Sequence, residues 1–390
     1  MKPRIGIFIP QLAAGGVQRC ILLLAKGFLN SGLEVDLVVG QADGPFRSQV
    51  PAGVNLVDLH SRHIRSTLPG LIRYIKTSKP TALLSAQTHA NIAAAWACKL
   101  SRHKTRLVVT EHNNMAAVVN SPEAGKDRLR PLMARMFYPW ADEIVAVSHG
   151  VASSLAELTS ISPDQIQVIY NPLIPEDLDS LRREAPSHPW LSSREIPVIL
   201  AAGRLEKQKD YPTLIQAGAL LNQKREVRLL ILGEGSQRLN LENLVVKLGI
   251  QSMVNMPGYV PNVYSYMQRA SVFVLSSAWE GFPSVLVEAM ACGIPVVSTN
   301  CPSGPDEILE GGKYGRLVPV GNPEVMAEEI ETALTNPGDI DRAQSRAGEI
   351  SIERAFQKLL SVLMGINEYK FYTRSRGWSL GGQRRCSSIY

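Results

Sequence analysis

Short apolar runs rich in β-branched residues alternate with amphipathic segments along the first half of the chain. In residues 17–30, for example, Ile21, Leu22, Leu24, Ala25 and Phe28 share one face, as expected for a helix packed on a sheet. The apolar runs predict strands at residues 4–9, 34–39, 54–59, 82–86, 107–111, 143–147 and 167–170.

The same alternation restarts at Pro197 and predicts a second set of strands. These fall at residues 198–202, 228–232, 254–256, 272–276, 296–298 and 316–319. Strands that alternate with helices form parallel sheets covered on both faces. The fold class is therefore α/β, with two Rossmann-like domains, and ligands are expected in the loops at the carboxyl ends of the strands.

Chain length and proline density support this division. A chain of 390 residues is longer than one hydrophobic core usually supports. A proline-rich stretch separates the two sets of strands, with prolines at 172, 175, 186, 189 and 197. We expect an N-terminal domain at 1–171, a linker at 172–196, a C-terminal domain at 197–366 and a basic tail at 367–390.

The net charge of +6 is unevenly distributed. Residues 1–185 carry a net +5, residues 186–368 a net −4 and residues 369–390 a net +5. This distribution gives no uniform basic surface, so nucleic acid is not an expected partner. A phosphorylated ligand or an anionic membrane remains compatible with the basic first half.

Cysteine usage and apolar run lengths bear on the compartment. The five cysteines are scattered and form no CxxC pair, which disfavours a disulfide framework and a zinc site. The apolar run at residues 5–10 is short for a signal peptide, and no run approaches the length of a membrane span. We expect a cytoplasmic protein, with attachment to the inner face of the plasma membrane still open.

Glu280 and Glu288 flank a predicted helix start in the segment EGFPSVLVEAM, residues 280–290. Gly281 permits a tight turn, and Pro283 suits the first helical position. The free N–H groups of such a helix start can bind an anion, with a carboxylate on either side to hold hydroxyl groups. A nucleotide-diphosphate sugar has this layout. The alternative is an ordinary surface helix with two exposed glutamates.

Two cations, Arg204 and Lys209, follow the predicted strand at 198–202. Cations at the carboxyl end of a strand can neutralise a diphosphate without a metal, each contact contributing about 1.5–3 kcal/mol. The alternative is that Glu206 and Asp210 pair with them on a solvated turn.

At this point the sequence resembles the retaining glycosyltransferases of family 4, which have the GT-B fold of two Rossmann-like domains facing across a cleft. The resemblance covers residues 4–365. Its motifs are EGFPSVLVEAMACGIPVV (280–297), GRLEKQKD (203–210), LILGEG (230–235), VIYNP (168–172), AVSHG (146–150), GGVQR (15–19) and TEHNN (110–114). The subgroup with Gly-Gly-x-Glu-Arg often acts in bacterial surface-polysaccharide and lipid-linked oligosaccharide synthesis. Gln18 replaces its glutamate here, which leaves acceptor recognition at that point open.

The resemblance implies a role for each matching residue. Glu280 would contact the transferred sugar and Glu288 the ribose diol, while Arg204 and Lys209 would stabilise the departing diphosphate. His112 would lie near the donor sugar; a core or helix-capping histidine is the alternative. The implied catalytic residues are Glu280, His112, Arg204 and Lys209, and the donor-binding residues are Gly15, Gly16, Arg204, Lys209, Gly258, Tyr259, Val260, Glu280, Gly281, Phe282, Pro283, Ser284 and Glu288.

The implied reaction moves a hexose or N-acetylhexosamine from a nucleotide-diphosphate sugar, most simply a UDP-sugar, to a glycan or lipid-linked acceptor. It retains the anomeric configuration, and no metal or other cofactor is expected. Two D-x-D sequences, at 177–179 and 339–341, are interpreted as solvated acids because neither follows a predicted central strand. A sugar-nucleotide epimerase on the same fold and a catalytically silent scaffold remain alternatives. An oxidoreductase is disfavoured because the first turn lacks G-x-G-x-x-G.

The first half is expected to hold the acceptor. Within it, residues 126–138 alternate cations with Leu129, Leu132, Met133, Met136 and Phe137, a pattern typical of a basic amphipathic helix. Peripheral contact with an anionic membrane and a surface helix packed on its own sheet are equally compatible with this pattern.

Overall fold

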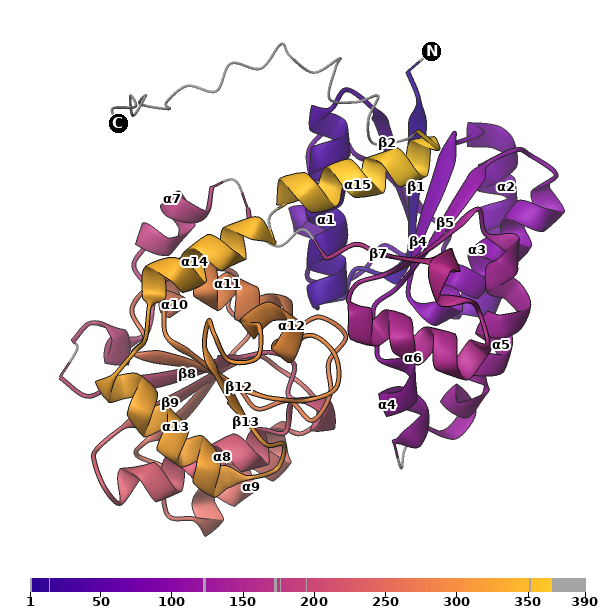
Figure 1. Ribbon diagram of the computed structural model, residues 1–390. Helices are drawn as coiled ribbons and strands as arrows, with labels where there is room; N and C mark the ends of the chain where they lie inside the picture. Colours follow the sequence, from indigo (N-terminus) through magenta and orange to yellow (C-terminus); the bar gives the residue numbers. More distant parts are fainter. Residues whose placement is uncertain are drawn as a thin grey trace, which may run out of the picture.

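The computed structural model describes residues 2–13, 15–121, 124–171, 174–175, 177–193, 195–350 and 352–366. The expected basic tail, 367–390, lies outside the described residues. Within them the chain forms two α/β domains, each built on one sheet (Figure 1).

The N-terminal sheet has seven strands in the order β3-β2-β1-β4-β5-β6-β7, and every pairing is parallel. Its strands are β1 (Arg4–Gln11), β2 (Glu34–Gln41), β3 (Asn55–Asp58), β4 (Ala82–Ala86), β5 (Arg106–Glu111), β6 (Glu143–Ala146) and β7 (Ile166–Val168). Its helices are α1 (Gly16–Asn30), α2 (Leu68–Ser78), α3 (Thr88–Ser101), α4 (Met115–Asn120), α5 (Arg130–Phe137) and α6 (His149–Thr159), with 3-10 turns η1 (Arg47–Gln49), η2 (Ile64–Thr67), η3 (Gly125–Leu129), η4 (Tyr138–Trp140) and η5 (Pro163–Gln165).

The C-terminal sheet has six parallel strands in the order β10-β9-β8-β11-β12-β13. The strands are β8 (Val198–Ala202), β9 (Arg228–Leu232), β10 (Val254–Gly258), β11 (Val272–Leu275), β12 (Val296–Thr299) and β13 (Arg316–Val318). Its helical elements are η7 (Lys207–Lys209), α8 (Tyr211–Asn222), α9 (Arg238–Lys247), α10 (Val263–Met267), α11 (Ser284–Cys292), α12 (Pro305–Leu309), α13 (Pro323–Thr335) and α14 (Ile340–Glu349). Along the sequence, the segment that connects the two sheets contains α7 (Leu178–Arg183) and η6 (Pro189–Leu191).

Both sheets are buried on two faces, which explains the continuous apolar runs in their strands. Along β1, Phe8 packs with α2 and α3 on one face, whereas Ile7 and Ile9 pack with α1 on the other. Each predicted strand matches one observed strand, with ends shifted by a few residues at most. The predicted α/β class with two Rossmann-like domains is confirmed.

The last described helix, α15 (Ile352–Met364), returns to the N-terminal domain. Its buried residues Phe356, Leu359 and Leu363 belong to the same core as Ile5 and Ile7 of β1. The Phe356 ring lies 5.1 Å from that of Phe28 on α1, and Figure 1 shows α15 crossing α1. Although α15 falls in the expected 197–366 unit by sequence, it completes the cover of the N-terminal sheet.

We predict that Phe356→Ala destabilises the N-terminal domain by about 3–5 kcal/mol, because it leaves a cavity between α1 and α15. Urea unfolding followed by circular dichroism measures the change. The matched control is Lys358→Ala, an exposed position on the same helix, which should shift stability by less than about 0.5 kcal/mol. Equal stability of the two variants would contradict this packing role.

Candidate active site

A cavity of about 350 Å³ lies between the two domains. Its lining residues lie at or after the carboxyl ends of β1, β2, β5 and β7 in one domain and of β8, β9, β10 and β11 in the other. Most of the residues expected at the donor site line it, namely Gly15, Gly16, His112, Arg204, Lys209, Tyr259, Val260, Glu280, Gly281, Phe282, Pro283, Ser284 and Glu288. Gly258 ends β10 and is not among the described residues that line the cavity.

Glu280 lies in the loop after β11 and is only 6% exposed. Its Oε1 accepts hydrogen bonds from Lys209 Nζ at 2.5 Å and from Ser277 Oγ at 2.6 Å. Gln208 Nε2 donates to the other carboxylate oxygen at 3.4 Å. A buried carboxylate needs such partners, and together they fix its position in the cavity wall.

The two cations after β8 are placed differently. Lys209 pairs with Glu280, while Asp210 accepts a hydrogen bond from Thr213, so the alternative pairing of Lys209 with Asp210 is not observed. Arg204 is exposed at the cavity and close to Glu206. Burial alone would raise the pKa of Glu206, but hydrogen bonds from Ser236 and the charge of Arg204 lower it overall.

Helix α11 begins at Ser284, one residue later than expected, with Pro283 at its N-cap. Pro283, Ser284 and Val285 line the cavity, so the positive end of this helix faces it. Glu288, one turn further, is 4% exposed, which excludes the surface-helix alternative for this carboxylate.

Glu288 is held by groups from both domains. Tyr264 Oη, from α10, donates to its Oε1 at 3.1 Å. Arg19 Nε, from α1 of the N-terminal domain, lies 3.7 Å from the same oxygen, and its guanidinium lies 5.0 Å from the centre of the Tyr264 ring. The GGVQR motif contains Arg19, but its pairing with Glu288 depends on how the domains meet and has no local signal in the sequence.

His112 follows β5 and is 8% exposed. Burial lowers its pKa to about 4, so the imidazole is neutral near physiological pH. Its Nε2 lies 3.0 Å from Thr110 Oγ1, while Nδ1 is buried with no hydrogen-bond partner in the described part of the chain. His112 caps no helix, because α4 is capped by Asn114. Buried polar atoms are usually paired, so this nitrogen is an exception.

Glu111, which we did not single out from the sequence, holds the backbone of His112 in place through a hydrogen bond. Its buried carboxylate accepts hydrogen bonds from Thr88 Oγ1 at 2.9 Å, Tyr138 Oη at 2.8 Å and the His112 N–H at 3.1 Å. Burial raises the pKa of Glu111 overall, although these hydrogen bonds act against that rise. The sequence signal that could have identified Glu111 is its position as a charged residue at the end of a buried strand.

The two domains approach each other closely at Gly281. A Cβ on this residue would lie 1.9 Å from the carbonyl oxygen of His112, so no other residue fits without a shift. Ser148 Oγ donates to the Gly281 carbonyl at 2.8 Å, and the next ring, Phe282, stacks on Tyr170 at 5.0 Å. Gly281 therefore sets how closely the two halves of the cavity approach each other.

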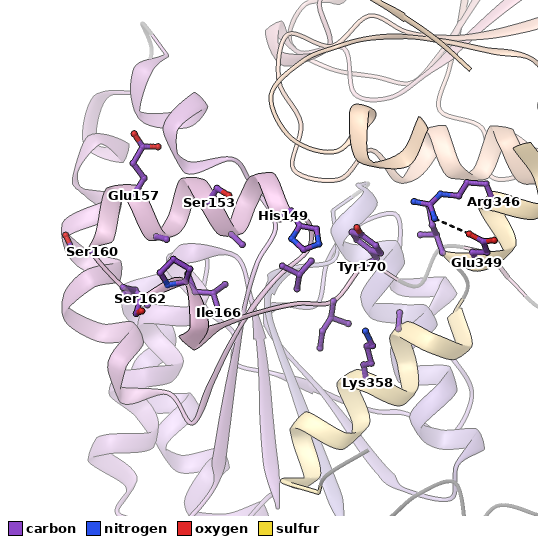
Figure 2. A pocket seen from close by; sticks show the side chains of 18 residues that line it. His149, Ser153, Glu157, Ser160, Ser162, Ile166, Tyr170, Arg346, Glu349 and Lys358 are labelled. Carbon is purple, nitrogen blue, oxygen red and sulfur yellow. Dashed lines mark hydrogen bonds and ion pairs between the residues drawn. The ribbon is translucent and has the colours of Figure 1, made fainter. Parts of the chain in front are cut away.

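A larger cavity of about 1340 Å³ lies outside this site, along the edge strand β7 (Figure 2). His149 and Tyr170 line one side of it, and Arg346 and Lys358 face them from α14 and α15. Arg346 is paired with Glu349 at 3.1 Å. None of the expected donor-site residues lines this cavity, so volume alone does not identify the site.

Comparison with known proteins gives two consecutive family matches. A family model described as Glycosyltransferase Family 4 matches residues 14–177. A model described as Glycosyl transferases group 1 matches residues 186–351. Together the matches cover both domains and include all seven of the sequence motifs quoted above.

Curated relatives match over most of their length. The chain is 28% identical over 384 residues to N-acetylgalactosamine-N,N'-diacetylbacillosaminyl-diphospho-undecaprenol 4-alpha-N-acetylgalactosaminyltransferase of Campylobacter jejuni, covering 93% of this chain and all of the relative. It is 26% identical to the lipopolysaccharide core biosynthesis glycosyltransferase LpsE of Rhizobium meliloti, covering 86% and 90%.

Solved structures share the fold. The crystal structure of HepE from Anabaena in complex with UDP-glucose matches with a TM-score of 0.78 and 21% identity, covering 93% of this chain and 100% of HepE. This likeness confirms the expected fold, with two Rossmann-like domains on either side of a cleft.

We predict that Gly281→Ala keeps the two domains from closing and sharply lowers activity, because its methyl group would overlap the His112 carbonyl. The Michaelis parameters and the unfolding midpoint of the variant check this. Gly348→Ala is the matched control: this exposed glycine of α14 has open space around its Cβ position. Unchanged turnover in Gly281→Ala would show that the approach seen here is not needed.

Proposed function

The chain belongs to the family-4 glycosyltransferases, and from this we propose that it transfers a hexose or N-acetylhexosamine, with retention of configuration, from a UDP-sugar to a lipid-linked or lipopolysaccharide glycan. The names of the relatives and the arrangement of charges in the cavity support this finer description.

One observation supports it above the others. Glu280 and Glu288 lie on either side of the start of α11, both buried, and the cations Arg204, Lys209 and Arg19 line the same cavity. A diphosphate at the helix start would meet these cations and the free N–H groups of the first turn. The two carboxylates then suit hydroxyl groups on either side of it, those of the sugar and those of the ribose.

The proposed reaction breaks the bond between the anomeric carbon and the phosphate oxygen. The acceptor oxygen bonds to that carbon on the same face, and the acceptor proton passes to the departing phosphate oxygen. Arg204 and Lys209 stabilise the charge that develops on the diphosphate. Glu280 orients the sugar and offsets positive charge on the ring, and neutral His112 hydrogen-bonds a sugar hydroxyl through Nδ1.

The relatives suggest the substrate class. The Campylobacter jejuni relative is named for a diphospho-undecaprenol acceptor, LpsE for lipopolysaccharide core and HepE was crystallised with UDP-glucose. For this chain we propose the same classes of donor and acceptor, used at the inner face of the membrane. Within the described part of the chain, no helix combines the length and apolar character needed to span a bilayer.

The two carboxylates should be separable by kinetics. We predict that Glu280→Gln lowers kcat by about 10²–10³-fold with little change in the donor KM, because its charge acts mainly in the transition state. Glu288→Ala should instead raise the donor KM by about tenfold or more, since it removes hydrogen bonds made on binding. UDP release with a lipid-linked acceptor is the assay.

The control is Glu242→Gln on α9, an exposed residue that pairs with Arg238 and does not line the cavity, which should behave as wild type. Full activity in Glu280→Gln combined with loss in Glu288→Ala would contradict the assigned roles. Conversion of the donor sugar without any acceptor, and without UDP release, would indicate the epimerase alternative.

We propose that transfer needs no metal and predict that it persists in EDTA. The two D-x-D sequences support this: Asp179 pairs with Arg182 at 2.7 Å, and Asp339 caps α14 by accepting from the Arg342 N–H at 3.0 Å. Arg204, Lys209 and α11 would take the place of a metal at the diphosphate. Rates with EDTA and with added Mg²⁺ test this, and loss of activity in EDTA would overturn it.

A further inference from the structure

Exposed apolar side chains gather on one face of the N-terminal domain. Of the twelve large apolar residues exposed in the described part of the chain, seven lie on α3, η3, α5 and η4. We call them the α3–α5 surface: Trp96, Leu100, Leu129, Leu132, Met133, Met136 and Trp140. Figure 1 shows α3 and α5 on the side of this domain away from the C-terminal domain.

Helix α5 is apolar on two sides. Its inner side buries Ala134 and Phe137 in the domain core. Leu129, Leu132, Met133 and Met136 recur at helical spacing on the other side, and Leu132 is 56% exposed. The surface-helix alternative therefore accounts for the inner residues only and leaves this second stripe unexplained.

Two tryptophans from different elements extend the stripe. Trp96 of α3 and Trp140 of η4 lie 5.0 Å apart, ring to ring, and both contact Phe137. Lys99 Nζ lies 5.7 Å from the centre of the Trp140 ring. Tryptophan and lysine side by side are typical of residues at the boundary between lipid tails and headgroups.

Cations predominate around this surface, although η3 also contains Asp127, which pairs with Arg130. Between Asp58 and Glu111 the sequence has no acidic residue and nine basic ones: Arg62, Arg65, Arg73, Lys76, Lys79, Lys99, Arg102, Lys104 and Arg106. Most of these belong to α2, α3 and the turns beside them, and α2 packs against α3. Lys126, Arg128 and Arg135 add exposed cations on the η3 and α5 side.

We propose that the α3–α5 surface docks on an anionic lipid bilayer, with its leucines, methionines and tryptophans inserted among the headgroups and its cations on lipid phosphates. Apolar residues ringed by cations match such a bilayer better than they match a protein face. This inference rests on the proposed function only for the reason why the protein would bind a membrane, which is that a lipid-linked acceptor lies in that bilayer.

The docking surface is connected to the active site. Tyr138, the first residue of η4, turns inward and donates to Glu111, which in turn holds the His112 N–H. The elements that would rest on lipid therefore also support a wall of the donor cavity.

The test is co-sedimentation with vesicles, without donor or acceptor. The purified full chain should pellet with vesicles of phosphatidylcholine and phosphatidylglycerol, less so at high salt, and poorly with phosphatidylcholine alone. The double variant Leu132→Glu, Met136→Glu should lose binding by about tenfold or more, because it places charge in the apolar stripe.

The matched control is Leu239→Glu, Val246→Glu on α9, which adds the same charge at equally exposed apolar positions of the other domain. It should bind vesicles as wild type. Equal binding by both double variants, or no binding of wild type to anionic vesicles, would overturn the proposal and leave a protein partner for this surface.

Failure of this inference is distinguishable from failure of the proposed function. The Leu132→Glu, Met136→Glu variant should keep the thermal shift that UDP-glucose induces and transfer to a detergent-dispersed acceptor. If instead wild type pellets with vesicles but shows no UDP-sugar shift, the docking proposal stands and the proposed donor is wrong.

Discussion

Two carboxylates buried between the domains constrain the rest of the structure. An ionised carboxylate away from water is stable only beside a cation or several hydrogen-bond donors. Glu280 forms an ion pair with Lys209 of its own domain, whereas Glu288 pairs with Arg19 of the other domain. The second pair ties the two domains together electrostatically. In the proposed function, these cations also contact the diphosphate of the donor.

Shape adds to this electrostatic constraint. The approach of Gly281 to the His112 carbonyl requires a residue without a side chain, and the Glu307 carboxylate accepts from the N–H groups of His149 and Gly150 at the start of α6. A helix start of one domain is thus capped by the other. Charge, a missing side chain and a shared helix cap all specify one arrangement of the domains.

The fold and the C-terminal half of the site could be predicted because their signals are local. Doubly buried parallel strands leave continuous apolar runs, and Glu280, Pro283 and Glu288 lie on one short segment. Contacts across the cleft could not be predicted in this way. Arg19 contacts Glu288, and the ring centres of Phe46 and Tyr259 lie 6.5 Å apart, only because segments that are distant in the sequence come together in space. For the same reason the pattern at 126–138 could not show that Trp96 and Trp140 share a surface with α5.

The return of α15 has a consequence for how the protein is made. One face of the N-terminal sheet, with Ile5, Ile7 and Ile9, shares its core with this helix, some 350 residues further along the chain. On a ribosome the first seven strands emerge long before α15 exists, so that face stays incompletely covered while the whole C-terminal domain is synthesised. The first domain to begin folding is therefore the last to be completed, and a chain that stops short of α15 leaves its apolar face open to other molecules.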